Sequence, residues 1–83
     1  MQIDDSIDWS TVIPQKISVR IDGHATSVSL EQPFLDILKA LARKKGQSLA
    51  FIITDIDSKR PQQLSLSASL RVYALQSILN QRL

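Results

Sequence analysis

The chain of 83 residues contains no cysteine and a single histidine. Without cysteine it cannot form a disulfide, and a structural zinc site has no plausible set of ligands. A domain of this length buries only a limited core, so a monomer has little stability to spare. We therefore expect one domain that gains stability by forming a homodimer.

Long apolar runs and the usual motifs of catalysis are also missing. No apolar run is long enough to cross a bilayer, and the acidic start MQIDDSIDW lacks the order of a signal peptide. We expect a soluble, cytoplasmic protein with no membrane partner. One histidine, no paired carboxylates and no phosphate-binding loop leave no site for chemistry. We therefore expect no enzyme, no catalytic residue, no metal and no cofactor.

The net charge of +2 is unevenly distributed along the chain. Three of the eight acidic residues fall in the first thirteen positions, which hold no lysine or arginine, so residues 14–83 carry a net charge of +5. This basic body fits a polyanionic partner or an ordinary solvated surface equally well. Residues 1–14 are expected to form an acidic arm ahead of a domain at 15–83. Its apolar side chains Ile3, Ile7 and Trp9 are expected to dock on the domain or on a neighbouring chain.

Residues 16–21 and 25–30 alternate polar and apolar side chains, which is typical of half-buried strands. Asp22-Gly23 lies between them and suits a two-residue type I′ hairpin turn, which places Ile21 opposite His24. One face of the predicted hairpin is then apolar, and the other is small, polar and basic. The apolar face holds Ile17, Val19, Thr26, Val28 and Leu30, and the polar face holds Lys16, Ser18, Arg20, Ala25, Ser27 and Ser29.

Three helices are expected after the hairpin. Residues 31–45 place apolar side chains at helical spacing and end in three cations before Gly46, a natural stop. Ser48 is a good N-cap for a second helix, although the β-branched run at 49–54 also fits a buried strand. A third helix is expected over residues 67–82. One core shared by two chains is expected from Ile17, Val19, Val28, Leu30, Phe34, Ile37, Leu41, Leu49, Ile52, Ile53 and Ile56.

The order strand, helix, Gly-x-Ser link, helix is specific enough to carry a resemblance. Leu30 and Gly46 are sixteen residues apart, and Gly46-Gln47-Ser48 supplies the link, so residues 25–56 resemble the ribbon-helix-helix (MetJ/Arc) superfamily. Residues 16–79 resemble more closely one bacterial subfamily of short ribbon-helix-helix proteins. The segments that carry this second resemblance are Gly23-His24, Thr26 to Glu31 and Leu70-Arg71-Val72-Tyr73-Ala74-Leu75. The resemblance implies a mostly α fold with a β-hairpin (α+β), in which an extra N-terminal strand and a third C-terminal helix join a ribbon-helix-helix unit in an intertwined homodimer.

The resemblance also implies a function, that of a dimeric DNA-binding protein and transcriptional regulator. In the superfamily, two copies of the strand pair antiparallel across a two-fold axis and direct their outward side chains into the major groove of double-stranded DNA. The N-terminus of the second helix anchors a phosphate. Carried onto this sequence, the base-facing positions are Ala25, Ser27 and Ser29, and the phosphate contacts are Ser48 and Leu49. The charge pattern adds four further phosphate contacts: Lys16, Arg20, Lys44 and Lys45.

The extra strand and the short side chains depart from the superfamily pattern. Ala25 cannot hydrogen-bond a base, and serines read bases weakly. A dimer built on the second strand would have a four-stranded sheet about 15 Å across, against a major groove about 12 Å wide. Either the first strand peels away, or the sheet lies on the backbone with Lys16 and Arg20 on phosphates. The alternative function is a protein–protein interaction module that holds its partner through the third helix or the N-terminal arm.

Overall fold

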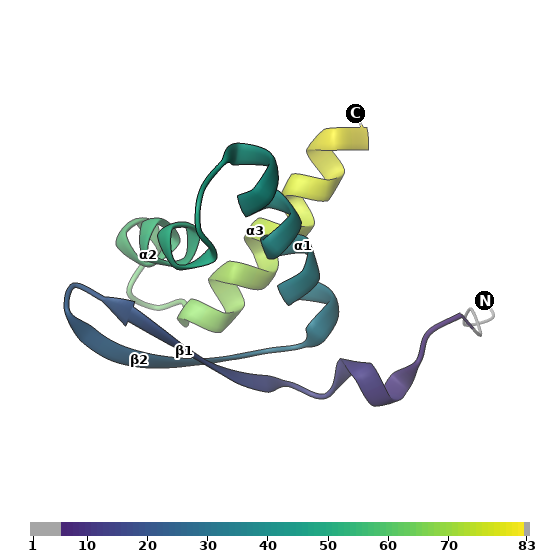
Figure 1. Ribbon diagram of the computed structural model, residues 1–83, viewed down its shortest axis with the longest axis horizontal. Helices are drawn as coiled ribbons and strands as arrows, with labels where there is room; N and C mark the ends of the chain where they lie inside the picture. The colour runs from purple at the N-terminus through teal and green to yellow at the C-terminus, as the bar shows by residue number, and fades with distance from the viewer. Residues whose placement is uncertain (1–5, 83) are drawn as a thin grey trace.

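A computed structural model describes residues 6–82 and gives a two-stranded antiparallel hairpin followed by three α-helices (Figure 1). In chain order the elements are the 3-10 helix η1 (Trp9–Val12), the strands β1 (Gln15–Ile21) and β2 (His24–Leu30), and the helices α1 (Gln32–Lys45), α2 (Leu49–Lys59) and α3 (Leu66–Arg82). All three helices lie on one face of the hairpin (Figure 1). The predicted α+β fold, with its extra first strand and its third helix, is confirmed. The homodimer stays a prediction.

The turn of the hairpin has the geometry that its sequence predicts. Asp22 has φ 51° and Gly23 has φ 82°, the two positive values that define a type I′ turn. This turn matches the twist of the strands and sets the predicted register, with Ile21 opposite His24. Because side chains alternate along a strand, the register turns the apolar face of both strands towards the helices. The hairpin therefore contributes one face to the core and leaves the other open to solvent.

Helix α1 ends at the predicted glycine. Gly46 has φ 66°, and its backbone N–H donates to the Arg43 carbonyl oxygen at 3.2 Å. The next N–H, that of Gln47, donates to the Ala42 carbonyl oxygen at 2.9 Å. These two bonds form a Schellman motif, which satisfies the last carbonyls of the helix and turns the chain back.

Helix α2 begins at the predicted cap. The Oγ of Ser48 accepts a hydrogen bond from the backbone N–H of Phe51 at 3.0 Å, as an N-cap does. The alternative of a buried strand at 49–54 is wrong, because the cap and the helical spacing outweigh the β propensity of the run. One face of the helix enters the core through three isoleucines: Ile52, Ile53 and Ile56.

The core forms within a single chain, and α3 completes it. Each of β2, α1, α2 and α3 supplies a side chain with no exposed surface, namely Leu30, Leu38, Ile53 and Leu70. The predicted core did not include α3, which also contributes the fully buried Ala74. Four predicted core residues are only partly buried within this chain: Ile17, Phe34, Ile37 and Leu49.

An ion pair ties α3 to the junction between β2 and α1. The Nε of Arg71 donates to Oε1 of Glu31 at 2.8 Å, and its Nη2 donates to Oε2 at 3.1 Å. The hydrogen bonds from Arg71 hold the pKa of Glu31 below its ordinary value. Glu31 occupies the N-cap position of α1 without capping it, since its carboxylate is turned to Arg71. This two-pronged contact fixes the start of α1 against α3.

The described part of the N-terminal arm, residues 6–14, lies at the end of the body opposite the hairpin turn (Figure 1). The side chain of Trp9 is 60% exposed and that of Ile7 is 41% exposed, although the 3-10 helix η1 contacts α1. Docking of these side chains on a neighbouring chain stays a prediction. Ile3 lies outside the described residues. Polar bonds organise this segment, because Oδ1 of Asp8 accepts from the backbone N–H and the Oγ of Ser10 at 3.1 and 2.6 Å. These bonds lower the pKa of Asp8.

Candidate nucleic-acid interface

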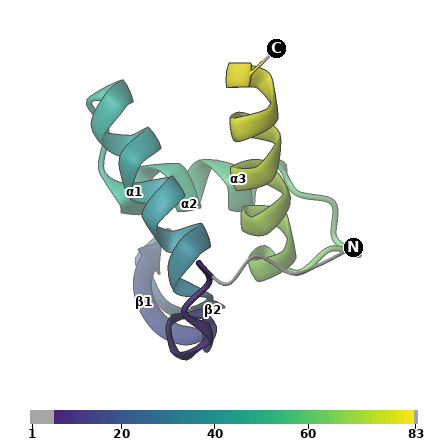
Figure 2. The ribbon, with the colours of Figure 1, turned by 90° about the vertical axis from the view of Figure 1, so that its right-hand side faces the viewer.

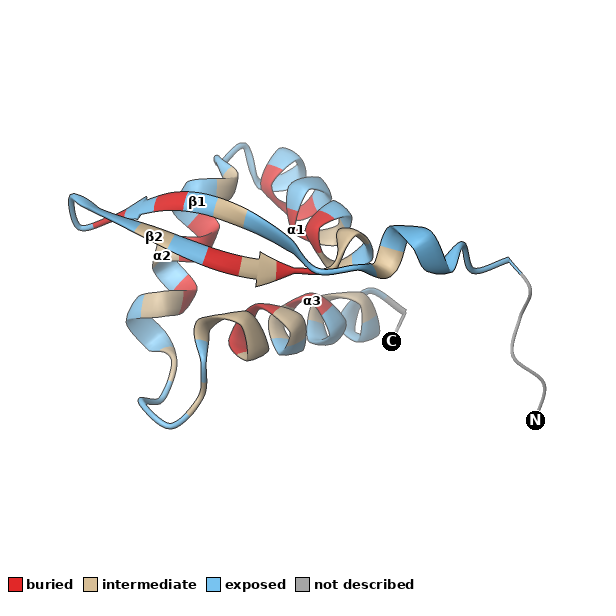
Figure 3. Cartoon of the chain, turned by 90° about the horizontal axis from the view of Figure 1, so that it is seen from below, coloured by how far each residue is buried: buried red, intermediate tan, exposed pale blue. Residues whose placement is uncertain are grey.

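The face of the hairpin that points away from the helices is polar and basic. Figure 3 views the strands from this side, and each alternates between buried and exposed residues. Five of its side chains are exposed and the last is half-buried: Lys16, Ser18, Arg20, Ala25, Ser27 and Ser29. These six residues are called the outer face of the hairpin. They include two cations and no acid, so the face has the charge that a polyanion requires.

The register arranges these side chains in three rows across the two strands. From the turn outwards, the pairs are Arg20 with Ala25, Ser18 with Ser27, and Lys16 with Ser29. The two cations therefore flank a central pair of hydroxyl groups. Four residues of extended chain place Lys16 and Arg20 about 13 Å apart along β1. Hydroxyls donate and accept hydrogen bonds, whereas cations suit phosphates, so the rows combine both kinds of contact.

Arg20 is held at the turn end of this face. Its Nη1 donates to the carbonyl oxygen of Gly23 at 3.0 Å, and the side chain is exposed. A guanidinium carries five N–H donors, so this bond leaves others for an outside acceptor. The contact reduces the conformational freedom of the side chain before any partner binds, which lowers the entropy cost of binding.

The start of α2 lies closer to the hairpin than the end of α1 does (Figure 1). Ser48 uses its oxygen as an acceptor for the cap bond and keeps its hydroxyl proton as a donor. The first turn, which begins at Leu49, contains no acidic residue. The N–H groups of a first helical turn have no partner within the helix, so they suit an anion.

The two predicted phosphate contacts at the end of α1 lie away from the outer face of the hairpin. This end is the part of α1 farthest from the hairpin (Figures 1 and 2), and it carries Lys44 and Lys45 in its last turn. The Nζ of Lys45 donates to Oη of Tyr73 at 2.9 Å and lies 5.6 Å from the centre of that ring. The hydrogen bond to Tyr73 raises the pKa of Lys45. Lys45 is thus engaged with α3.

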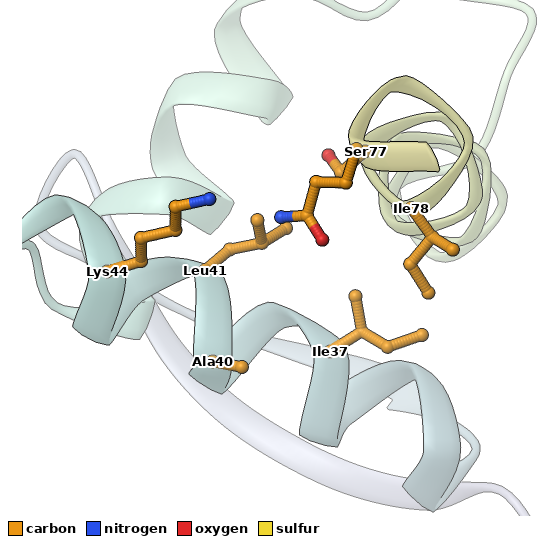
Figure 4. Close-up of a pocket in the computed structure, with 7 residues that line it drawn as sticks. Ile37, Ala40, Leu41, Lys44, Ser77 and Ile78 are labelled. Atoms are coloured by element: carbon orange, nitrogen blue, oxygen red, sulfur yellow. The ribbon is translucent and has the colours of Figure 1, made fainter. Parts of the chain in front are cut away.

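Lys44 borders a cavity of about 180 Å³ between α1 and α3 (Figure 4). The cavity is lined by Ile37, Ala40, Leu41, Lys44, Ser77, Ile78 and Gln81. Its walls are mostly apolar, and the Oγ of Ser77 is used within α3 as a donor to the Tyr73 carbonyl oxygen at 2.8 Å. The predicted phosphate contacts therefore divide into two groups, one on the hairpin and the start of α2, the other at the far end of α1.

Ser18 belongs to the outer face of the hairpin, although it is not among the predicted DNA contacts. It lies opposite Ser27 in the middle row of the outer face and is exposed. The same alternation that predicted the polar face points to it, but the superfamily pattern assigns base contacts only to the second strand. Because β1 and β2 pair along their whole length, the two strands share one surface.

Two further properties concern only the part of the chain that the structure describes. Over residues 6–82, no group of three or more acidic or histidine side chains could hold a metal ion. Within the same range, no helix has both the length and the apolar character needed to cross a membrane.

Comparison with known proteins gives two matches, one to a family model and one to a solved structure. A family model described as a ribbon-helix-helix domain matches residues 14–78. A solved structure of an uncharacterized protein from Bordetella pertussis Tohama I has a TM-score of 0.79 and 28% sequence identity, covering 93% of this chain and 65% of that one. The chain thus spans just under two thirds of that protein. A search of curated proteins gave no match. Since the family model spans both strands, α1, α2 and most of α3, the chain belongs to the ribbon-helix-helix domain family.

Proposed function

We propose that this chain is a homodimeric DNA-binding protein that regulates transcription in the bacterial cytoplasm, and that the outer face of the hairpin contacts the DNA. Ribbon-helix-helix domains are typically DNA-binding transcription regulators. The observation that carries the proposal is the outer face itself. It is uncovered by any helix and holds Lys16 and Arg20 without an acidic neighbour on either strand.

The hairpin is itself a two-stranded ribbon, and we propose that each chain supplies both strands. Peeling β1 away would expose Val19 and Ile21, which are 7% and 8% exposed, so the pair is expected to stay together. Its two strands lie about 5 Å apart, and a major groove about 12 Å wide admits a ribbon of this size. The hairpin of one chain can then enter the major groove without a four-stranded sheet formed by two chains.

The chemistry of the face favours contact with the backbone over reading of bases. Lys16 and Arg20 suit phosphates, and these contacts set position and affinity without sequence information. Ser18, Ser27 and Ser29 reach base edges only weakly, and Ala25 offers only an apolar contact. The start of α2, at Ser48 and Leu49, is proposed as a further phosphate contact. Lys44 and Lys45 are expected to contribute less, because the end of α1 lies away from this face.

The proposal is tested by fluorescence-anisotropy titration with pooled duplex fragments from the genome that encodes the protein, at low and at physiological salt. Phosphate contacts release counterions, so affinity must fall as salt rises. Tight binding to some fragments at physiological salt supports a regulator and identifies its target. Binding seen only at low salt supports a backbone contact and rejects sequence-specific regulation. No binding at low salt rejects DNA as the partner.

A protein–protein interaction module is the second candidate function, and one observation favours it. Val72, Leu75 and Leu79 of α3 are large apolar side chains that remain 58%, 54% and 43% exposed. Such a surface marks a contact with another protein more often than a contact with DNA. A protein that self-associates or binds another protein, yet ignores DNA at low salt, supports this alternative.

A further inference from the structure

The cavity between α1 and α3 has an apolar end and a cationic end. Ile37 of α1 and Ile78 of α3 lie at one end, and Lys44 lies at the other (Figure 4). The side chain of Leu41 lies between Lys44 and Ile37, so the α1 wall is apolar up to the ammonium group. A pocket that combines apolar walls with one placed polar group selects both the body and the orientation of a ligand.

The size of the cavity follows from the helices that form it. The C-terminal halves of α1 and α3 diverge as they leave the hairpin (Figures 1 and 2), and the small side chains of Ala40 and Ser77 leave space between them. The volume is about 180 Å³. An apolar cavity of about 150 Å³ accepts benzene, and pockets for drug-sized molecules start at about 300 Å³. The space therefore fits one ring or a short branched chain.

Lys44 supplies the positive charge of the cavity. Among the described residues its ammonium makes no hydrogen bond or ion pair, whereas that of the adjacent Lys45 donates to Oη of Tyr73. The hydroxyl proton of Ser77 is already donated within α3, so this side chain offers an anion no donor. Gln81 also lines the cavity, and its amide can donate to the same acceptor as Lys44.

The charges of the two helices favour an anion over a cation. Their one acidic residue is Asp36, and its Oδ1 accepts from Nε2 of Gln32 at 2.7 Å. None of the described residues that line the cavity is acidic. The basic residues in the sequences of α1 and α3 are Lys39, Arg43, Lys44, Lys45, Arg71 and Arg82. A negatively charged group at this end of the two helices is therefore attracted rather than repelled.

We propose that the cavity binds a small carboxylic acid in its ionised form, with its apolar body between Ile37 and Ile78 and its carboxylate on the ammonium of Lys44. An aromatic or branched aliphatic acid about as large as benzoate has this shape. Acetate and inorganic phosphate lack the apolar body, and a neutral apolar molecule lacks a partner for Lys44. The site is separate from the outer face of the hairpin. It also lies away from the edges of the sheet, where strands of two copies can pair.

NMR titration of the full chain with benzoate, acetate and benzyl alcohol tests the site and its ligand class. Benzyl alcohol keeps the ring without the charge, and acetate keeps the charge without the ring. We expect benzoate to shift the resonances of Ile37, Leu41 and Ile78 saturably, and to bind about fivefold or more tightly than either other probe, as a partly exposed ion pair allows. Equal affinity for benzoate and benzyl alcohol overturns the carboxylate.

Two further outcomes of the titration overturn the site itself. One is a benzoate response confined to residues outside the cavity. The other is no saturable response at all, which includes the case in which a second copy of the chain covers the cavity. That case is recognised because the resonances of the lining residues then change with protein concentration in the absence of benzoate.

Lys44→Gln tests the charge, because it removes the cation and keeps a side chain of similar length. Benzoate binding should weaken about fivefold, while the affinity for benzyl alcohol should stay unchanged. Lys39→Gln is the matched control, since Lys39 is an exposed lysine of the same helix outside the lining, and it should bind benzoate like the wild type. Equal benzoate affinities of the two variants overturn the contact with Lys44.

Ala40→Phe tests the apolar part of the site by filling it. Ala40 is exposed and lines the cavity, so the variant should keep the helical circular-dichroism spectrum and lose binding of both benzoate and benzyl alcohol. Wild-type affinity for benzoate in this folded variant overturns the location. None of these experiments contains DNA, so their outcome is separate from that of the proposed function.

Discussion

The outer face of the hairpin and the apolar side of α3 that carries Val72, Leu75 and Leu79 are both exposed, yet their chemistry is opposite. The first presents cations and hydroxyls, represented by Lys16 and Ser18, and the second presents half-exposed aliphatic side chains such as Leu75. Each lies on the back of an element whose other side closes the same core. The contrast indicates two different partners, because cations attract a polyanion and an apolar row attracts another apolar row.

The largest expected effect separates the two faces of α3. Leu70→Ala should lower the free energy of unfolding of the monomer by about 2–5 kcal/mol, because it leaves a cavity in the core. Leu75→Ala, on the outer face, should change it by no more than about 0.5 kcal/mol. Urea unfolding, at a protein concentration low enough to keep the chain monomeric, measures the free energy of unfolding of both variants. Equal losses for the two variants would contradict the assignment of inner and outer faces.

The next effect concerns the outer face of the hairpin. Arg20→Glu or Lys16→Glu should weaken DNA binding and reduce the slope of log affinity against log salt by about 1, as expected for one lost phosphate contact. The measurement is an anisotropy titration at several salt concentrations. Leu75→Ala serves as the control from the other face and should leave the slope unchanged in any range where the protein is dimeric.

A smaller effect is expected at the ion pair that holds α3 in place. Glu31→Gln should cost about 1 kcal/mol at neutral pH, since the pair with Arg71 is bidentate but still 23–34% exposed. Arg71 lowers the pKa of Glu31 in the folded chain, so this stabilisation is complete above the pKa of the unfolded chain and is lost as pH falls through the folded value. Unfolding of both proteins at pH 7 and well below pH 4 checks it, because the difference should vanish in acid.

The smallest effect is expected at the far end of α1. Lys44→Glu places the same charge change beside the cavity between α1 and α3, away from the hairpin. DNA affinity at low salt should fall less than it does for Lys16→Glu, in the same titration. A larger fall for Lys44→Glu would move the DNA contact from the hairpin to the end of α1.

Local signals in the sequence predicted most of the fold. Asp22-Gly23 fixed the turn and the register, Gly46 ended α1 and Ser48 capped α2, because each of these depends on neighbours within a few residues. Alternation along the strands also placed the polar face of the hairpin correctly. These signals act through backbone geometry, which does not require knowledge of the packed chain.

Contacts between distant residues could not be predicted in this way. Arg71 and Glu31 are forty residues apart, and nothing in either segment identifies the other as its partner. Likewise, the apolar pattern of α3 did not show that Leu70 enters the core while Leu75 stays outside, because α3 is apolar on both sides. For the same reason the sequence did not show that the lysines at the end of α1 lie apart from Lys16 and Arg20.

The most direct test of the DNA contact is an anisotropy titration at low salt that compares the wild type with the double variant Lys16→Glu/Arg20→Glu. The two substitutions change only the outer face of the hairpin, where both side chains are exposed and neither contributes to the core. The account predicts that the wild type binds duplex DNA and that the double variant loses nearly all of this affinity. Equal affinity of the two proteins would contradict the assignment of the outer face as the DNA-binding surface.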